Sequence, residues 1–442
     1  MRNKLFILVS IIALLLAIVV LFLVMFFSGR TTTPATEESN PFGNTSTERP
    51  IASSTLGEYP LTSTDTDWIR PTGNTPATDV PMLRMLSKDP VSSAVPYTQG
   101  VSTTTNGTAY VRYVLRTSGS ILETPLAIAT PPVTLSQKTI LRVGRSLWVR
   151  SGTSVLMQYL DESNEDLFSY LGNFTAPSAS STEKMPEVFT GRPLPNNIIT
   201  ATFSPDGASV FYLTPSEKGA EGYIESITSG TRALVYSTPF RSMTAVWGNA
   251  GTIVLYNNPS QDASGAVWIL DPKTWKAKVV LSDQYALSAR ISPSGTKLLY
   301  SMMEGGQNST IFSLRVLDLK TNNVIYLPLP TLSEKCVWGH TDEQGVYCAV
   351  PKNNLRTNDF MARWYMGQLT YEDVLWHFNA DTGAGKQIID PSEEVDAPFD
   401  IIDLAIDPIN TFVTFRTKQK EMLWAVRLPQ ATVATSTADT NI

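Results

Sequence analysis

The fold is decided by a pattern that is clearest in the stretch ATFSPDG (Ala201–Gly207), which runs into SVFYL (Ser209–Leu213). A short apolar run leads into a turn in which a proline fixes φ and a glycine supplies positive φ, and a second apolar run follows. This order of residues predicts two antiparallel strands joined by a tight turn.

The same pattern returns along the chain. Ala245–Gly251 runs into Ile253–Tyr256, and Ala289–Gly295 runs into Lys297–Tyr300. An aromatic residue or isoleucine precedes each turn, at Trp148, Phe203, Trp247, Ile291, Trp338 and Ile406. Two further apolar segments follow each hairpin, so the repeat holds four strands in roughly 45–50 residues, which is typical of a β-propeller blade.

Seven such repeats fit between residues 81 and 429. The predicted fold class is therefore all-β: a seven-bladed β-propeller, preceded by a single N-terminal transmembrane helix and a disordered linker. The last repeat, 401–428, has only three strands, and Met82–Leu86 is left over at the other end. We expect these two parts to pair and close the ring, because an unclosed stack would expose open sheet edges.

Residues 1–30 read as a cytoplasmic N-terminus and a transmembrane signal anchor. Leu5–Phe27 contains no charged residue and is long enough to span a bilayer as a helix. Arg2 and Lys4 precede this run, which predicts a cytoplasmic N-terminus and an extracytoplasmic propeller. The alternative, a cleaved signal peptide, has a shorter apolar region and a small-residue cleavage site.

Residues 31–80 read as a flexible tether that is rich in serine, threonine and proline. Such a composition buries too little apolar surface to offset the entropy of ordering. The alternative is a segment partly docked on the folded domain through Trp68 and Ile69. Residues 430–442 form a similar low-complexity tail.

The composition excludes several classes of protein. The chain of 442 residues has 17% charged residues and a net charge of −6, so it lacks the basic surface of a nucleic-acid-binding protein. It contains two histidines and two cysteines, which makes a zinc site unexpected. No phosphate-binding loop, nucleophile elbow or dinucleotide fingerprint is present, and we predict no cofactor, no metal site and no catalytic residue.

The Phe203–Gly207 motif resembles the PD40 repeat of TolB-like propellers. The span 81–429 also resembles a family of membrane-anchored propellers common in small-genome candidate-phylum bacteria. This second resemblance is carried by Leu83–Ser87, Val111–Val114, Glu334–Trp338, Val346–Pro351, Trp364–Tyr365 and Leu423–Trp424. It implies a location and a fold, and no activity. Arg363 departs from it, because an acidic residue is expected before Trp364.

Cys336 and Cys348 are equidistant from Asp342, the centre of a predicted hairpin. Directly opposed residues of antiparallel strands lie close enough for a disulfide, and an exported chain meets oxidising conditions. We therefore predict a disulfide that fixes the turn between them. The alternative is a pair of buried free thiols.

The insertion Lys352–Thr370 is the strongest candidate for a functional site. It separates the second strand of the sixth repeat from the third, and long loops on rigid scaffolds often carry binding function. Tryptophan, tyrosine and arginine are common interface anchors. The predicted binding residues are Arg356, Asp359, Phe360, Arg363, Trp364, Tyr365 and Met366. The alternative is that the aromatic residues only pack the loop down as a lid.

These features predict a non-catalytic binding or scaffold module at the cell envelope, with a protein, peptide or glycan as partner. The alternative is an extracytoplasmic enzyme that acts on polysaccharide at the mouth of the channel. That alternative needs two carboxylates about 5–10 Å apart in one pocket. Asp403 and Asp407 are the candidates on an inner strand.

Overall fold

The computed structural model describes residues 80–429, except 101–106, 137–138, 161–162, 164, 176–186, 249–250, 307–308, 310, 341–343 and 354–359. The predicted signal anchor (1–30), the predicted tether up to residue 79 and the predicted tail (430–442) lie outside the described residues. Within the described part of the chain, no helix is long and apolar enough to cross a membrane.

The described residues form an all-β structure of six hydrogen-bonded sheets. Five sheets have four strands and one has seven. The long strand β17 (Ala277–Ile291) divides the seven-stranded sheet, because its first half pairs with the strand before it and its second half with the strand after it. The pairing thus gives seven groups of four strands, which we call blades 1 to 7.

The strands of each blade follow one another along the chain. Blade 1 contains β2 (Val91–Gln99), β3 (Thr108–Leu115), β4 (Ile121–Pro125) and β5 (Val133–Ser136). Blade 2 contains β6 (Val143–Trp148), β7 (Ser154–Leu160), β8 (Leu167–Thr175) and β9 (Val188–Leu194). Blade 3 contains β10 (Thr200–Phe203), β11 (Ser209–Ser216), β12 (Gly219–Ser226) and β13 (Arg232–Thr238). Blade 4 contains β14 (Met243–Trp247), β15 (Ile253–Asn257), β16 (Ser264–Leu270) and the first half of β17.

The remaining blades complete the series. Blade 5 contains the second half of β17, β18 (Lys297–Glu304), β19 (Ile311–Asp318) and β20 (Val324–Tyr326). Blade 6 contains β21 (Cys336–Trp338), β22 (Gly345–Pro351), β23 (Asp373–Asn379) and β24 (Gly385–Ile389). Blade 7 contains β25 (Ile401–Ile406), β26 (Phe412–Thr417), β27 (Leu423–Arg427) and β1 (Leu83–Ser87). The helical segments are η1 (Ser333–Lys335), α2 (Phe360–Tyr365) and α3 (Pro391–Glu394).

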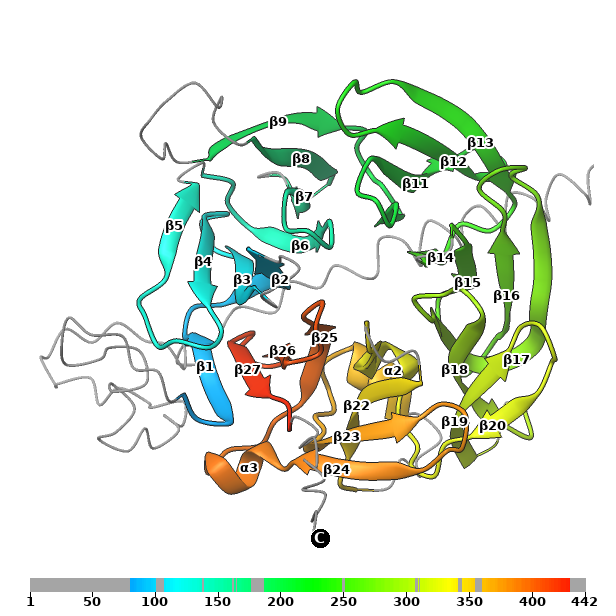
Figure 1. Cartoon of the computed structure of the whole chain (residues 1–442). Coiled ribbons are helices and arrows are strands. Elements are labelled where there is room, and N and C mark those ends of the chain that lie inside the picture. Colours follow the sequence, from blue (N-terminus) through cyan, green and yellow to red (C-terminus); the bar gives the residue numbers. More distant parts are fainter. Residues whose placement is uncertain are drawn as a thin grey trace, which may run out of the picture. The chain divides into compact units, whose positions relative to one another are not determined.

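The sheets stand around a common centre, as in a propeller, and the last strands return beside the first (Figure 1). No sheet in the described part closes on itself as a barrel. The ring is completed by β1, which pairs antiparallel with β27 in a register that places Leu83 opposite Val426 and Met85 opposite Trp424. This pairing is the one that the sequence predicts for Met82–Leu86.

The second strand of each blade is buried on both sides because neighbouring blades cover both faces of the sheet. Val210, Phe211, Tyr212 and Leu213 of β11 are all fully buried. Val210 and Tyr212 pack in a core cluster with side chains of blade 2, whereas Phe211 and Leu213 pack with side chains of blade 4. This two-sided burial explains why these strands read as continuous apolar runs rather than alternating ones.

The turn motif has the structure that its residues predict. The Ser204 hydroxyl accepts a hydrogen bond from the Ser209 amide at 2.9 Å, and Asp206 accepts one from the Ala208 amide at 3.0 Å. Gly207 has a φ of 69°. A Cβ there would also lie 2.5 Å from a methyl carbon of Val149 in blade 2, so a larger residue is excluded by packing as well as by backbone conformation.

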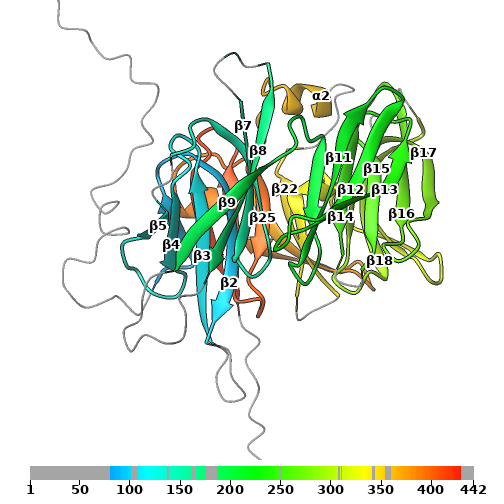
Figure 2. The same ribbon diagram turned by 90° about the horizontal axis from the view of Figure 1, so that it is seen from above.

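The ring has two distinct faces. We call the face where β22 ends and α2 lies the α2 face, and the face with the first turn of each blade, such as the turn at Gly207, the hairpin face. Figure 2 shows α2 on one face and the end of β2 on the other. Because β27 ends at the hairpin face and β1 begins opposite its end, both ends of the described chain lie at the hairpin face.

Arg84 connects the closing strand β1 to blade 1. Its side chain is buried, and its two terminal nitrogens donate to the carbonyl oxygens of Ile128 at 2.9 Å and Pro125 at 2.7 Å. Burial lowers the pKa of Arg84 to about 10. The guanidinium therefore replaces the water that these two carbonyls would otherwise bind.

We expect Arg84→Met to lower the free energy of unfolding by about 3 kcal/mol, because the apolar stem is kept while two partly buried carbonyls lose a charged donor. Urea unfolding of the full chain followed by tryptophan fluorescence measures this. Arg427→Met, at an exposed position of β27, is the matched control and is expected to change nothing measurable. Equal effects of the two substitutions would contradict the role given to Arg84.

Cys336 and Cys348 form the disulfide that their spacing predicts. They lie directly opposite each other in β21 and β22, with Cα atoms 4.1 Å apart, and both are buried. The bridge joins the two strands just below the turn that starts at Gly339. β21 has three residues and pairs within its sheet with β22, so the bridge fixes this inner strand of blade 6.

We expect a reductant to lower the free energy of unfolding of the wild type by about 3 kcal/mol, as the chain-entropy model gives for a closed loop of this size. The same reductant is expected to leave the double variant Cys336→Ala/Cys348→Ala unchanged. Thermal and urea unfolding with and without reductant test both statements. An unchanged wild type would show that the bridge adds no stability.

Candidate functional site

The insertion between β22 and β23 lies on the α2 face and contains α2. Arg356 and Asp359, two of its predicted binding residues, lie outside the described residues. The others divide by exposure. Phe360 and Trp364 are buried, whereas Tyr365 is 42% exposed and Met366 is 63% exposed. Arg363 is partly exposed.

Phe360 and Trp364 pack α2 onto the blades. The ring of Phe360 meets Phe312 of β19 edge to face, with centroids 5.3 Å apart. Trp364 stacks on Tyr371 with centroids 5.9 Å apart, and both belong to a core cluster that includes Met303 of β18. These contacts are the ones expected if the aromatic residues pack the insertion down as a lid. Of the predicted binding residues, Tyr365 and Met366 are the large apolar ones that remain exposed.

A buried ionic cluster lies beneath α2. The Nζ atom of Lys335 lies 2.6 Å from Oδ2 of Asp373 and 2.9 Å from Oδ1 of Asp400, and all three side chains are fully buried. Trp364 donates its indole N–H to Oδ2 of Asp400 at 2.8 Å. The Tyr371 amide donates to the same carboxylate at 3.1 Å. The cluster therefore holds α2 to strands of blades 6 and 7.

A second cation completes the contacts of α2. Lys418 donates to the carbonyl oxygen of Trp364, and its Nζ lies 4.3 Å from the centre of the Trp364 ring. Tyr365 donates its hydroxyl to Glu334. Two lysines thus face Trp364, because Nζ of Lys335 lies 5.1 Å from the same ring.

Burial dominates the electrostatics of the cluster. It raises the pKa of Asp373 to about 6, with Lys335 opposing this rise and the neighbouring charge of Asp400 adding to it. Among the described residues, the Oδ1 atom of Asp373 has no hydrogen-bond partner. One carboxylate of the cluster is therefore only half satisfied, which makes its ionisation costly.

Sequence reasoning missed Lys335, Asp373 and Asp400 as a group. Each is a single charged residue next to an apolar strand, and such positions usually face solvent. The three come from η1, β23 and the residue before β25, so only the arrangement of blades 6 and 7 brings them together. No sequence signal marks the cluster.

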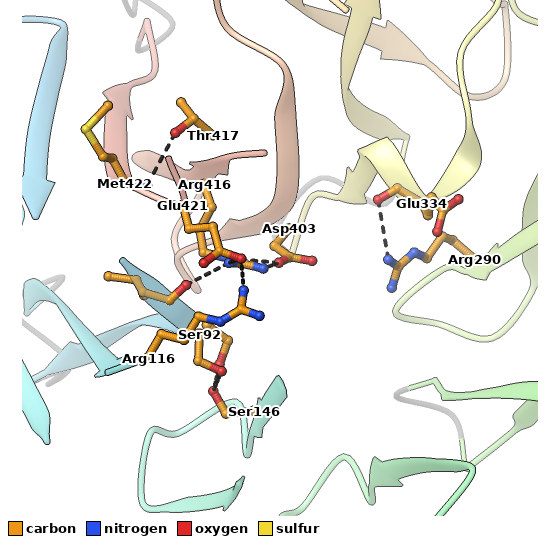
Figure 3. A network of polar contacts seen from close by, with 12 residues as sticks. Ser92, Arg116, Ser146, Arg290, Glu334, Asp403, Arg416, Thr417, Glu421 and Met422 are labelled. Atoms are coloured by element: carbon orange, nitrogen blue, oxygen red, sulfur yellow. Dashed lines mark hydrogen bonds and ion pairs between the residues drawn. The ribbon is translucent and has the colours of Figure 1, made fainter. Parts of the chain in front are cut away.

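A second polar network lies closer to the centre of the ring, on blades 7, 1 and 2 (Figure 3). Arg416 donates through Nε to Asp403 at 2.9 Å and through Nη1 to the carbonyl oxygen of Val91 at 2.7 Å. Arg116 forms an ion pair with Glu421. Ser146 donates to Ser92 at 3.0 Å, which joins blade 2 to blade 1.

The carboxylates named for the enzyme alternative do not share a pocket. Asp403 bonds to Arg416 at a backbone position with a φ of 51°. Asp407 is buried in the following turn, where it accepts hydrogen bonds from the amides of Thr411 at 2.6 Å and Phe412 at 2.5 Å. Three residues separate the two, and each carboxylate is engaged by its own partners. The pair therefore does not have the geometry of two cooperating catalytic carboxylates.

A pocket of about 740 Å³ opens on the α2 face beside this network. It is lined by residues of blades 7, 1, 2 and 3, because the second strands end and the first strands begin there. The charged residues of its lining are three arginines, Arg116, Arg142 and Arg145, and one acidic residue, Glu421. Its apolar lining consists of Pro90, Leu141, Leu160, Leu167, Ile198 and Ile199.

Two structural features mark this pocket. Leu141 is 61% exposed and Leu160 is 43% exposed, which is unusual for large apolar residues at the ends of buried strands. Arg142 has a φ of 58°, a left-handed conformation that few arginines adopt. Neither feature is visible in the sequence, and only the pair Arg142 and Arg145 could have indicated a local positive charge.

The raised pKa of Asp373 predicts a pH dependence of stability. Its folded-state pKa of about 6 lies above the unfolded value of 3.8, so the folded state binds the proton more tightly. The stability that this provides is present below pH 4 and is lost as the pH rises through 6. Between pH 4 and 7 we expect the wild type to lose about 2 kcal/mol more unfolding free energy than Asp373→Asn does. Asp396→Asn, at an exposed position, is the control and should follow the wild type; parallel pH profiles for Asp373→Asn would contradict this assignment.

Comparison with known proteins concerns the fold. No protein-family model matches the chain, and no curated protein matches it. Among solved structures, TolB from Acinetobacter baumannii is similar at 14% identity and a TM-score of 0.39, over 61% of this chain and 59% of that one. The tricorn protease is similar at 9% and 0.48, over 80% of this chain and 34% of that one.

An oligogalacturonate lyase in complex with manganese is similar at 10% identity and a TM-score of 0.46, over 80% of this chain and 96% of that one. The similar structures thus include propellers of the TolB type. They also include enzymes, and the likeness is one of fold alone.

Proposed function

We propose that this chain is a membrane-anchored, extracytoplasmic β-propeller, closed and seven-bladed, that acts as a non-catalytic binding or scaffold module for a protein, peptide or glycan at the cell envelope. The observation that carries this proposal is the α2 face, which combines a pocket of about 740 Å³ with the exposed side chains of Tyr365 and Met366. A concave site with convergent charges on a rigid scaffold is the usual form of a binding site.

The direction of the strands supports this use of the α2 face. The folded chain begins at β1 and ends after β27, both at the hairpin face. Residue 80, the first described residue, therefore lies at the hairpin face, on the opposite side of the ring from α2 and the pocket.

The buried cluster beneath α2 supports a scaffold rather than a moving lid. Asp400 pairs with Lys335 and accepts from Trp364 out of contact with water, so lifting α2 would remove a hydrogen-bond donor from a buried carboxylate. The exposed Tyr365 and Met366 are consequently presented on a fixed helix. Rigid presentation lowers the entropy cost of binding.

Site-specific photo-crosslinking in intact cells tests the proposal. A photoreactive amino acid in place of Met366 is expected to yield discrete adducts, and the same amino acid in place of Arg427, at the hairpin-face end of β27, is expected not to yield them. Mass spectrometry identifies the adducts. The proposal fails if position 366 yields none, or if both positions yield the same ones.

A further inference from the structure

The pocket that lines the junction of blades 7, 1, 2 and 3 has a definite chemical character. We propose that it binds an acidic peptide segment in which a carboxylate lies next to an apolar side chain. This inference rests on the proposed function and names the class of its partner.

The first argument is charge. The lining holds three arginines and one glutamate, in a chain whose net charge is −6. Glu421 is occupied by Arg116. The Arg145 side chain makes no hydrogen bond or ion pair with the residues that the structure describes, and it is exposed to solvent at the pocket. A guanidinium in this state is a ready partner for a carboxylate, which it can bind through two parallel hydrogen bonds.

The second argument is the apolar part of the lining. Leu141 and Leu160 stand 61% and 43% exposed at the pocket, and Leu167 and Ile199 lie partly exposed beside them. A ligand that covers these side chains gains the free energy of removing apolar surface from water. An inorganic anion would leave them wet, so the ligand must bring an apolar group together with its charge.

The third argument separates a peptide from a charged glycan. Sugar rings commonly pack against flat aromatic side chains, and Tyr159 is the one aromatic residue in the lining. Its ring is already stacked on Phe168, with centroids 5.8 Å apart and planes inclined by 20°. The remaining apolar surface is aliphatic and irregular, which suits leucine, isoleucine or phenylalanine side chains of a peptide.

The fourth argument is the firmness of the site. Arg116 is fixed by Glu421, and the backbone of Glu421 accepts a hydrogen bond from the Val91 amide at 2.9 Å. Gln158 donates to the carbonyl oxygen of Ile198 at 3.3 Å, which ties blade 2 to the residue before blade 3. These contacts hold the walls of the pocket in place before a ligand arrives. The volume of the pocket lies within the usual range of ligand-binding pockets.

The test uses the full chain in detergent micelles and a fluorescein-labelled hexapeptide that alternates leucine and glutamate. We expect saturable binding by fluorescence anisotropy, weakened by added salt because the contacts are ionic. The same peptide with glutamine in place of glutamate is expected to bind at least roughly tenfold more weakly. A uronate oligosaccharide of equal charge is expected not to compete.

The variants separate the two halves of the proposal. Arg145→Gln is expected to weaken binding of the leucine–glutamate peptide roughly tenfold, whereas the matched control Arg427→Gln, on the hairpin face, is expected to leave it unchanged. Leu141→Ser is expected to weaken the acidic and the glutamine peptides alike. Circular dichroism confirms that each variant is folded.

Several outcomes would overturn the inference. Equal affinity for the two peptides, an unchanged affinity in Arg145→Gln, or tighter binding of the uronate oligosaccharide each excludes an acidic peptide at this site. If the peptides fail while position 366 still yields its adducts in cells, the inference is wrong and the proposed function stands. If position 366 yields none while the peptide binds as expected, the peptide site stands and the recognition function proposed for α2 is wrong.

Discussion

The two ends of the folded chain meet in blade 7, where β1 pairs with β27, and blade 7 packs against blade 1 along a seam. Seven blades bury both faces only if each has a neighbour on either side, so the burial of the others depends on this seam. Besides the β1–β27 ladder, two buried arginines secure it. Arg84 reaches from β1 to the carbonyls of Pro125 and Ile128, and Arg416 reaches from β26 to the carbonyl of Val91.

The seam also joins architecture to the candidate site. Arg116 and Glu421 pair across it and at the same time line the pocket on the α2 face. A group that both closes a ring and faces a ligand is held by the stability of the whole domain, so its position changes little on binding. Blade 6 has a similar arrangement: the cluster of Lys335, Asp373 and Asp400 that holds α2 also connects blades 6 and 7.

Removing Lys335, Asp373 and Asp400 from water costs desolvation free energy, which can exceed the free energy gained from their mutual attraction. An apolar trio of the same volume would often be as stable or more so. What the charges add is geometry: Asp400 accepts from Trp364 and Tyr371 in fixed directions, and the Asp373 carboxylate accepts from the Ile401 amide at 2.7 Å. These directed hydrogen bonds tie α2 to Asp400 and the start of β25 to Asp373.

The sequence could predict what depends on neighbouring residues. The Ser204–Gly207 turn, the opposition of Cys336 and Cys348, and the partner of Met82–Leu86 all follow from local patterns counted along the chain. The helix within the 352–370 insertion could not be predicted, since its six residues are too few to show the periodic spacing of apolar residues that marks a helix. The pocket did not follow either: Arg116, Arg145 and Glu421 come from blades 1, 2 and 7, and their proximity exists only once the ring is closed.

The closed ring also decides how an acidic chain can attract an acidic ligand. At physiological ionic strength the Debye length is about 8 Å, so a ligand does not respond to the net charge of a domain of this size but to the groups nearest to it. At the pocket those groups are Arg116, Arg142 and Arg145, with one glutamate already paired among them. The distribution of charge over the two faces, rather than its sum, therefore sets the preference of the site. That distribution follows from the direction of the strands. The α2 face consists of the residues at which second strands end and first strands begin, and the lining of the pocket is drawn from these residues.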